Sequence, residues 1–224
     1  MIKIAPSILS GDHGNLSGEA SRIERWGADW IHVDIMDGSF APNLTFGPGA
    51  VRAIRKVTKI PLDCHLMLSE PARYAERFLE AGADIVTVHA EAITPETMDK
   101  IEATVKRHGK RLGVAFKPAT DLKSFNLSDR DISVVIVMTV NPGFSGQKFM
   151  AEIVPKVKEA SDLFKGRGVE IEVDGGVDTG NARILCERGA TVLVAGNSVL
   201  GQREPDLAFK ELRNAIGDCH KQQC

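Results

Sequence analysis

The feature that most constrains this chain is an apolar run of strand length followed by an amphipathic stretch, a unit that recurs along all 224 residues. The amphipathic stretches have apolar residues at three- and four-residue spacing, which is typical of helices packed on a core. The strand-like runs lie at 3–9, 30–36, 60–67, 84–90, 111–116, 133–140, 169–175 and 191–197, and clear helical stretches lie at 71–82, 151–164 and 181–189. The sequence therefore predicts a strand and then a helix, eight times.

A short internal repeat has the same period. Gly-Ala followed by Asp or Thr stands between a helical stretch and the next strand at Gly27, Gly82 and Gly189. Gly82 lies 55 residues after Gly27 and Gly189 lies 107 residues after Gly82, close to two and four units of about 28 residues. Glycine suits a helix C-terminus because it enters the left-handed region without steric cost.

Alternating strands and helices require a parallel sheet, and eight units without a second domain favour a closed barrel. We expect a single (β/α)8 TIM barrel domain over residues 1–224. The structural alternative is an open doubly wound sheet, but no G-x-G-x-x-G motif opens a first helix, which disfavours its dinucleotide-binding form.

Charge and composition exclude several function classes. Lys and Arg number 28 against 30 Asp and Glu, so no positive excess is available for nucleic acid or an anionic membrane. No apolar run is long enough to span a bilayer, and no signal segment precedes the first strand. The four cysteines show no metal or disulfide spacing. A cytoplasmic protein with reduced thiols is expected.

Polar residues stand at inward positions of strands that should be apolar. Alternation puts His32 and Asp34 on one face of the second strand, and Asp63 and His65 on one face of the third. Asp174 ends the seventh strand, at the rim where barrel enzymes carry catalytic groups. Buried imidazoles and carboxylates need partners, and both are good ligands for divalent transition metals. Two histidines and two aspartates can therefore meet at the top of the barrel.

Other residues in the same strands have simpler interpretations. His89 stands alone at the end of the fourth strand and is interpreted as a hydrogen-bonded core histidine. Met36, Met67 and Met138 face the same interior, where residue type alone favours core filling.

Glycine-bearing segments follow the last three strands, at 141–147, 174–176 and 195–198. Each one alone could be a tight turn. Together, their free backbone N–H groups predict an anion site, because barrels often bind phosphate at the loops after strands seven and eight.

Along nearly its whole length the chain resembles the ribulose-phosphate 3-epimerase family. The resemblance lies in the combination and order of short segments rather than in any one of them. They are IAPSILS (4–10), HVDIMDGSFAPNLTFGP (32–48), DCHLML (63–68), MTVNPGFSGQKF (138–149), EVDGG (172–176) and VAG (194–196). The resemblance implies an isomerase of the pentose phosphate pathway, usually homo-oligomeric, that epimerises C3 of D-ribulose 5-phosphate to give D-xylulose 5-phosphate.

The resemblance also assigns site residues. It implies that His32, Asp34, His65 and Asp174 bind one divalent ion, zinc, iron, manganese or cobalt, and that the two aspartates exchange the substrate proton through an enediolate. Ser7 and His65 would contact the sugar, and Met36, Met67 and Met138 would cap the reacting carbon. The implied phosphate site comprises Gly143, Phe144, Ser145, Gly146, Gly175, Gly176, Gly196 and Asn197. Asn197 replaces the family's usual Ser or Thr, so its side-chain contact with phosphate is open.

Three other functions fit parts of the pattern. A hexulose-6-phosphate (allulose-6-phosphate) 3-epimerase would share the same motifs on a longer sugar. Phosphate-binding decarboxylases and tryptophan-pathway isomerases share the barrel but do not call for the histidine and aspartate set. A non-catalytic sugar-phosphate-binding barrel would leave the paired carboxylates without a purpose.

Overall fold

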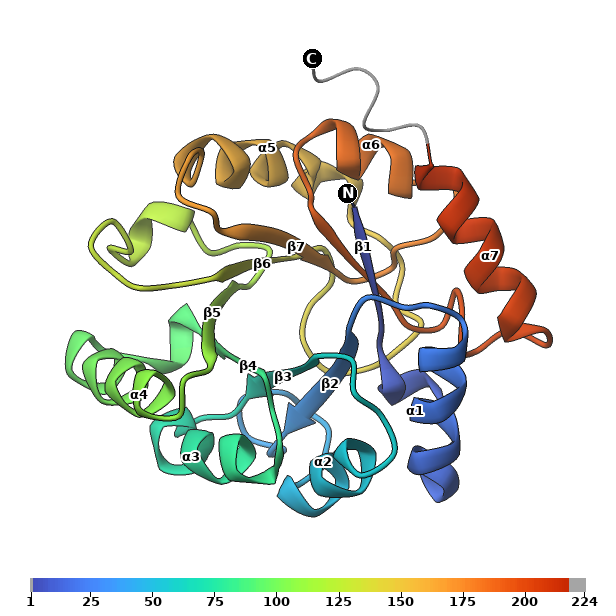
Figure 1. Cartoon of the computed structure of the whole chain (residues 1–224). Coiled ribbons are helices and arrows are strands. Elements are labelled where there is room, and N and C mark those ends of the chain that lie inside the picture. Colours follow the sequence, from blue (N-terminus) through green and yellow to red (C-terminus); the bar gives the residue numbers. More distant parts are fainter. Residues whose placement is uncertain (1, 218–224) are drawn as a thin grey trace.

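The computed structural model describes residues 2–217, in which eight parallel strands wrap around a common axis with helices outside them (Figure 1). Hydrogen-bonded neighbours run in the order β1-β8-β7-β6-β5-β4-β3-β2, and a parallel bridge between Ser7 and His32 joins the two ends. The strands are β1 Lys3–Pro6, β2 Ile31–Met36, β3 Leu62–Met67, β4 Ile85–His89, β5 Arg111–Phe116, β6 Val134–Met138, β7 Glu170–Asp174 and β8 Val192–Ala195. The predicted (β/α)8 barrel is confirmed.

Seven α-helices in the described range form the outer layer (Figure 1). They are α1 Leu16–Arg25, α2 Pro48–Arg55, α3 Pro71–Ala81, α4 Pro95–Arg107, α5 Val154–Leu163, α6 Ala182–Glu187 and α7 Pro205–Ile216. Five of them, α2, α3, α4, α5 and α7, have proline in the first turn, where no backbone N–H is needed. None of these helices has the length and apolar character that crossing a bilayer requires.

The unit after β5 differs from the predicted pattern, because its connection contains only a 3-10 turn, Leu122–Ser124. Asp121 accepts a hydrogen bond from the N–H of Lys123, a local pairing that competes with helix formation. Lys156 of α5 donates to the carbonyl of Lys117 at 2.7 Å, and Arg167 donates to that of Leu127 at 3.1 Å. Cations from the following unit thus satisfy the carbonyls of this connection.

The Gly-Ala repeat has a structural cause. Gly27, Gly82 and Gly189 have φ of 76°, 114° and 98°, the left-handed region that the sequence predicts for them. The residue after Gly-Ala turns its side chain to the first N–H groups of the neighbouring strand and accepts a hydrogen bond there. The pairs are Asp29 with Ile4 at 2.8 Å, Asp84 with Leu62 at 3.0 Å and Thr191 with Ile171 at 2.9 Å. Each pair ties an even-numbered strand to the odd-numbered strand before it, so the repeat recurs every two units.

The barrel interior is divided between apolar and polar strands. Small and branched apolar residues of β1, β5, β6 and β8 fill part of the interior, as shown by Ala5, Ala115, Ile136 and Val194. The strands β2, β3, β4 and β7 instead bury ionisable and hydroxyl groups. These are His32, Asp34, Asp63, His65, Thr87, His89 and Glu172. Cys64 and Cys186 lie in the core, and Cys219 and Cys224 fall outside the described residues.

Candidate active site and metal centre

Three strands bring the predicted ligand set together. β2 carries His32 and Asp34, β3 carries His65 in register with Asp34, and β7 ends in Asp174. One ligand atom from each of these four side chains lies within 4.8 Å of the other three. All but Asp174 are buried. The structure therefore places the four residues as the sequence analysis expects, while their role as metal ligands stays a prediction.

One nitrogen of each histidine faces both carboxylates. His65 Nδ1 lies 3.5 Å from Asp34 Oδ1 and 3.4 Å from Asp174 Oδ2. His32 Nε2 lies 3.3 Å and 3.8 Å from the same two oxygens. Neither nitrogen has a partner of good hydrogen-bond geometry among the described residues, although both are buried. Buried polar atoms without partners are costly. Two imidazole nitrogens that converge with two carboxylates fit a divalent transition metal well.

The electrostatics of the metal-free cluster are those of a cation site. Burial opposes the ionisation of Asp34, but the positive charge and close contacts of His32 and His65 hold the pKa of Asp34 well below its usual range. Burial favours a neutral His65, yet its close contacts with Asp174 and Asp34 raise the pKa of His65 to about 9. Protons therefore balance the carboxylates here, and a metal ion would replace them.

A second layer of buried groups lies beneath this cluster. His32 Nδ1 lies 2.8 Å from Asp63 Oδ2 and 3.1 Å from Glu172 Oε1. Thr87 donates to Asp63 at 3.1 Å. Burial and the nearby charge of Asp63 raise the pKa of Glu172 to about 8. The sequence predicts no role for Asp63 or Glu172, although Glu172 stands two residues before Asp174 and so shares its inward face.

His89 is more than an isolated core histidine. Its Nε2 lies 2.9 Å from Nε2 of His65, and its Nδ1 lies 3.0 Å from Oε2 of Glu91. Burial lowers the pKa of His89 to about 4. Glu91, in the turn after β4, was not singled out from the sequence, because its link to His65 runs through His89 and depends on the folding of β3 beside β4.

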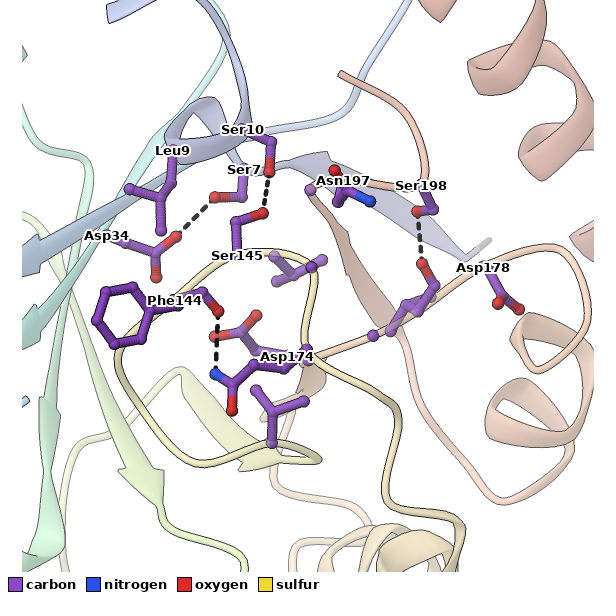
Figure 2. Close-up of a pocket in the computed structure, with 18 of the residues that line it drawn as sticks. Ser7, Leu9, Ser10, Asp34, Phe144, Ser145, Asp174, Asp178, Asn197 and Ser198 are labelled. Carbon is purple, nitrogen blue, oxygen red and sulfur yellow. Dashed lines mark hydrogen bonds between the residues drawn. The ribbon is translucent and has the colours of Figure 1, made fainter. Parts of the chain in front are cut away.

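A pocket of about 710 Å³ opens above the cluster at the carboxyl ends of the strands (Figure 2). All but one of the predicted substrate-binding residues line this pocket, and the exception is His65. The lining residues are Ser7, Met36, Met67, Met138, Gly143, Phe144, Ser145, Gly146, Gly175, Gly176, Gly196 and Asn197. Ser7 donates to Asp34 at 2.6 Å, a contact drawn in Figure 2. The three methionines are almost wholly buried; Met36 and Met67 belong to one apolar cluster and Met138 to another.

The glycine loops meet at one end of the pocket. Gly175 and Gly176 have φ of 126° and 65°, and a Cβ on either would collide with the backbone of Val140 or Phe149. Close backbone packing therefore requires both glycines. Ser10 and Ser145 meet at 2.5 Å between their hydroxyl oxygens (Figure 2). Small side chains and free backbone groups characterise this end, as an anion site of the predicted kind requires.

Asn197 and Ser198 differ in orientation. The hydroxyl of Ser198 donates to the carbonyl of Val177 at 2.5 Å (Figure 2). The side chain of Asn197 lies near Gly146, since a Cβ on that glycine would be 3.7 Å from Asn197 Cγ. The hydroxyl of Ser198 is therefore used in a bond to the backbone, whereas the side chain of Asn197 faces the loop of Gly146 in the pocket.

Fold and site together define a (β/α)8-barrel protein with a buried histidine and carboxylate centre beneath a pocket at the carboxyl ends of the strands. The particular family follows from comparison: the model of the ribulose-phosphate 3 epimerase family matches residues 3–200, and the chain belongs to this family. This confirms the resemblance inferred from the motifs.

Individual relatives agree over almost the whole chain. The ribulose-phosphate 3-epimerase of Bacillus subtilis is 46% identical over 218 residues, covering 96% of this chain and 100% of the relative. The cytoplasmic isoform of Oryza sativa is 42% identical and covers 96% and 94%. Among solved structures, 3-keto-L-gulonate-6-phosphate decarboxylase of Vibrio cholerae superposes with a TM-score of 0.72 at 18% identity, over 96% of this chain and 97% of that one. This last likeness concerns the fold alone.

Proposed function

We propose that this chain catalyses the metal-dependent interconversion of D-ribulose 5-phosphate and D-xylulose 5-phosphate. The observation that carries the proposal is the pair Asp34 and Asp174, which reach one pocket from β2 and β7 with two unpartnered histidine nitrogens between them. The relatives with 46% and 42% identity are named for this reaction. Homo-oligomerisation stays a prediction from the resemblance, and a cytoplasmic location stays a prediction from the sequence.

The chemistry needs two proton-transfer groups. Epimerisation beside a ketone begins when a base removes the proton from C3, which leaves an enediolate. An acid on the opposite face then returns a proton to C3 and inverts the centre. We assign these roles to Asp34 and Asp174, which exchange roles for the reverse reaction. The low pKa of Asp34 keeps its carboxylate ionised, the form in which it can act as the base.

His32 Nε2, His65 Nδ1 and one oxygen from each aspartate would hold the metal. When bound, a divalent transition ion such as zinc, iron, manganese or cobalt supplies Lewis acidity that offsets negative charge developing on the substrate oxygens. Ser7, which donates to Asp34, orients that carboxylate and can also reach the sugar.

The remaining pocket groups bind and shield the substrate. The glycine loops with Ser145 and the backbone of Asn197 would hold the phosphate by N–H and hydroxyl groups. Met36, Met67 and Met138 present thioethers and methylene groups near the aspartates, which excludes water from the enediolate without competing for protons. Because water is excluded, the proton that returns to C3 comes from a carboxyl group and not directly from solvent.

The test is an incubation with D-ribulose 5-phosphate in deuterated water, with metal-replete and chelator-treated protein, followed by NMR. Metal-dependent D-xylulose 5-phosphate that carries deuterium at carbon 3 is the expected result. Turnover of D-allulose 6-phosphate in its place would identify the hexulose-phosphate epimerase. Binding of either sugar phosphate without exchange at carbon 3 would identify a non-catalytic barrel.

A further inference from the structure

We propose that His89 and Glu91 form a hydrogen-bond relay that fixes the tautomer of His65 and so makes Nδ1 of His65 the metal-binding atom. The inference rests on the metal centre of the proposed function and adds two positioning residues to it. Neither residue touches the pocket: the relay runs from the turn after β4, behind the cluster, to His65 on β3.

The relay begins at the carboxylate of Glu91. Its Oε1 accepts the backbone N–H of Lys117 at 2.8 Å, and its Oε2 lies 3.0 Å from Nδ1 of His89. An ionised carboxylate can only accept hydrogen bonds. Hydrogen bonds from His89, Thr120 and Lys117 outweigh the effect of burial and lower the pKa of Glu91 to about 2. The Nδ1 atom of His89 must therefore carry a hydrogen.

The next step joins the two imidazoles. Their Nε2 atoms are 2.9 Å apart and their planes differ by 23°, so one nitrogen donates and the other accepts. A neutral imidazole that donates from Nδ1 offers a lone pair at Nε2. His89 therefore accepts, and His65 carries its hydrogen on Nε2.

The last step reaches the metal centre. With its hydrogen on Nε2, neutral His65 has a lone pair on Nδ1, the nitrogen that faces Asp34 and Asp174 at 3.5 and 3.4 Å. The opposite tautomer would aim an N–H at the ion and could not bind it. Tautomer selection by the second nitrogen is the general way in which proteins orient histidine ligands.

Burial makes the relay rigid. His65 and His89 are both 0% exposed, and Phe40 packs on His89 with ring centroids 4.6 Å apart. Water cannot replace His89 as the partner of His65. The side chain of Glu91 is 19% exposed, which places the only solvent-accessible end of the relay at the carboxylate.

Three variants test the relay through zinc affinity. Glu91→Gln removes the obligate acceptor, and His89→Leu removes the acceptor of His65. Each should weaken zinc binding by about 10- to 100-fold, the usual cost of losing an outer partner of a metal ligand. His89→Gln keeps an amide oxygen that can accept from His65 and should recover most of the affinity lost in His89→Leu. The matched control is the exposed pair His108 and Glu76, 3.4 Å apart, where His108→Gln and Glu76→Gln should leave zinc affinity unchanged.

A second measurement needs no variant. Long-range ¹H–¹⁵N NMR of the zinc-loaded protein should show His89 with hydrogen on Nδ1 and a bare Nε2, and His65 with hydrogen on Nε2. Hydrogen on Nε2 of His89, or unchanged zinc affinity in both Glu91→Gln and His89→Leu, would overturn the relay. A wild-type protein that binds no zinc would overturn the relay and the metal centre together. Loss of zinc affinity in the variants of a protein that epimerises neither sugar phosphate would support the relay and refute the proposed function.

Discussion

The imidazole of His32 and the carboxylate of Asp63 lie 2.8 Å apart, from Nδ1 to Oδ2, and both side chains are wholly buried. His32 donates from Nδ1 to this carboxylate, so the neutral ring, the form that binds metal, has its lone pair on Nε2, which faces Asp34 and Asp174. The two histidines of the centre are thus oriented differently. A carboxylate contacts His32 directly, while His65 reaches its carboxylate through His89.

Asp63→Asn should lower zinc affinity about 10- to 100-fold, because the amide can also donate and no longer selects one tautomer of His32. Turnover at saturating metal should fall much less than affinity, since Asp63 does not line the pocket. Zinc affinity measured by competition with a chelating dye checks this. Asp131→Asn, at an exposed position before β6, is the control. Equal zinc affinities in the three proteins would contradict the role of Asp63.

Asp34→Asn and Asp174→Asn should each reduce turnover by roughly 10²- to 10⁴-fold, the usual contribution of a general acid or base. Both residues are also proposed ligands, so kcat must be measured alongside bound metal in each variant. A variant that retains its metal and loses turnover separates proton transfer from metal binding. Near-normal kcat in either metal-loaded variant would refute the two-aspartate mechanism.

Strand periodicity explains how much of the site the sequence could predict. His32 and Asp34, like Glu172 and Asp174, are two residues apart, so alternation alone puts each pair on one inward face. Alternation does not say which neighbour a buried group meets. That depends on the register of β3 against β4, where His65 pairs with Thr87 while its side chain reaches His89. The roles of Glu172 and His89 therefore required the three-dimensional structure.

Helices could be predicted where apolar residues recur at helical spacing. The prediction of a helix failed after β5, where polar residues dominate. Residues 71–82 predict a helix, and α3 forms there with Gly82 at its C-terminus. After β5, by contrast, Asp121 and Asn126 hydrogen-bond to nearby N–H groups, and Lys156 and Arg167 arrive from later in the chain. Contacts with cationic side chains from distant parts of the chain leave no local signal in the sequence.

Metal binding should release protons and strengthen as pH rises. In the metal-free protein the contacts with Asp174 and Asp34 raise the pKa of His65 to about 9, and the neighbouring carboxylates raise that of His32 despite its burial. Below pH 9 an incoming ion must displace a proton from Nδ1 of His65, so affinity should increase with pH up to at least that value. Asp34, whose pKa is low, contributes no proton.

Calorimetric titration with zinc in two buffers of different ionisation enthalpy measures the protons released. About one to two per ion are expected near neutral pH, one for each histidine that the ion deprotonates. Zinc affinity that does not change between about pH 6 and 8 would mean that these histidines are already neutral, contrary to their contacts with the carboxylates.

The predicted phosphate site can be tested with a single methyl group. A Cβ at Gly196 would lie 2.7 Å from the hydroxyl of Ser10 and 3.6 Å from that of Ser145, and the backbone there needs no glycine-specific angle. Gly196→Ala should therefore displace the hydroxyl of Ser10 and crowd the anion pocket, without straining the backbone of the strand end. Loss of one hydrogen bond to a charged phosphate costs about 1.5 kcal/mol or more, so KM should rise roughly tenfold. The substitution leaves the proposed proton-transfer groups, Asp34 and Asp174, unchanged, so kcat should change little. Gly49→Ala, where a Cβ meets nothing within 4 Å, is the matched control. An unchanged KM in Gly196→Ala, relative to the control, would mean that phosphate binds elsewhere in the pocket. The glycine loops of Gly146 and Gly176 would then not be the phosphate site.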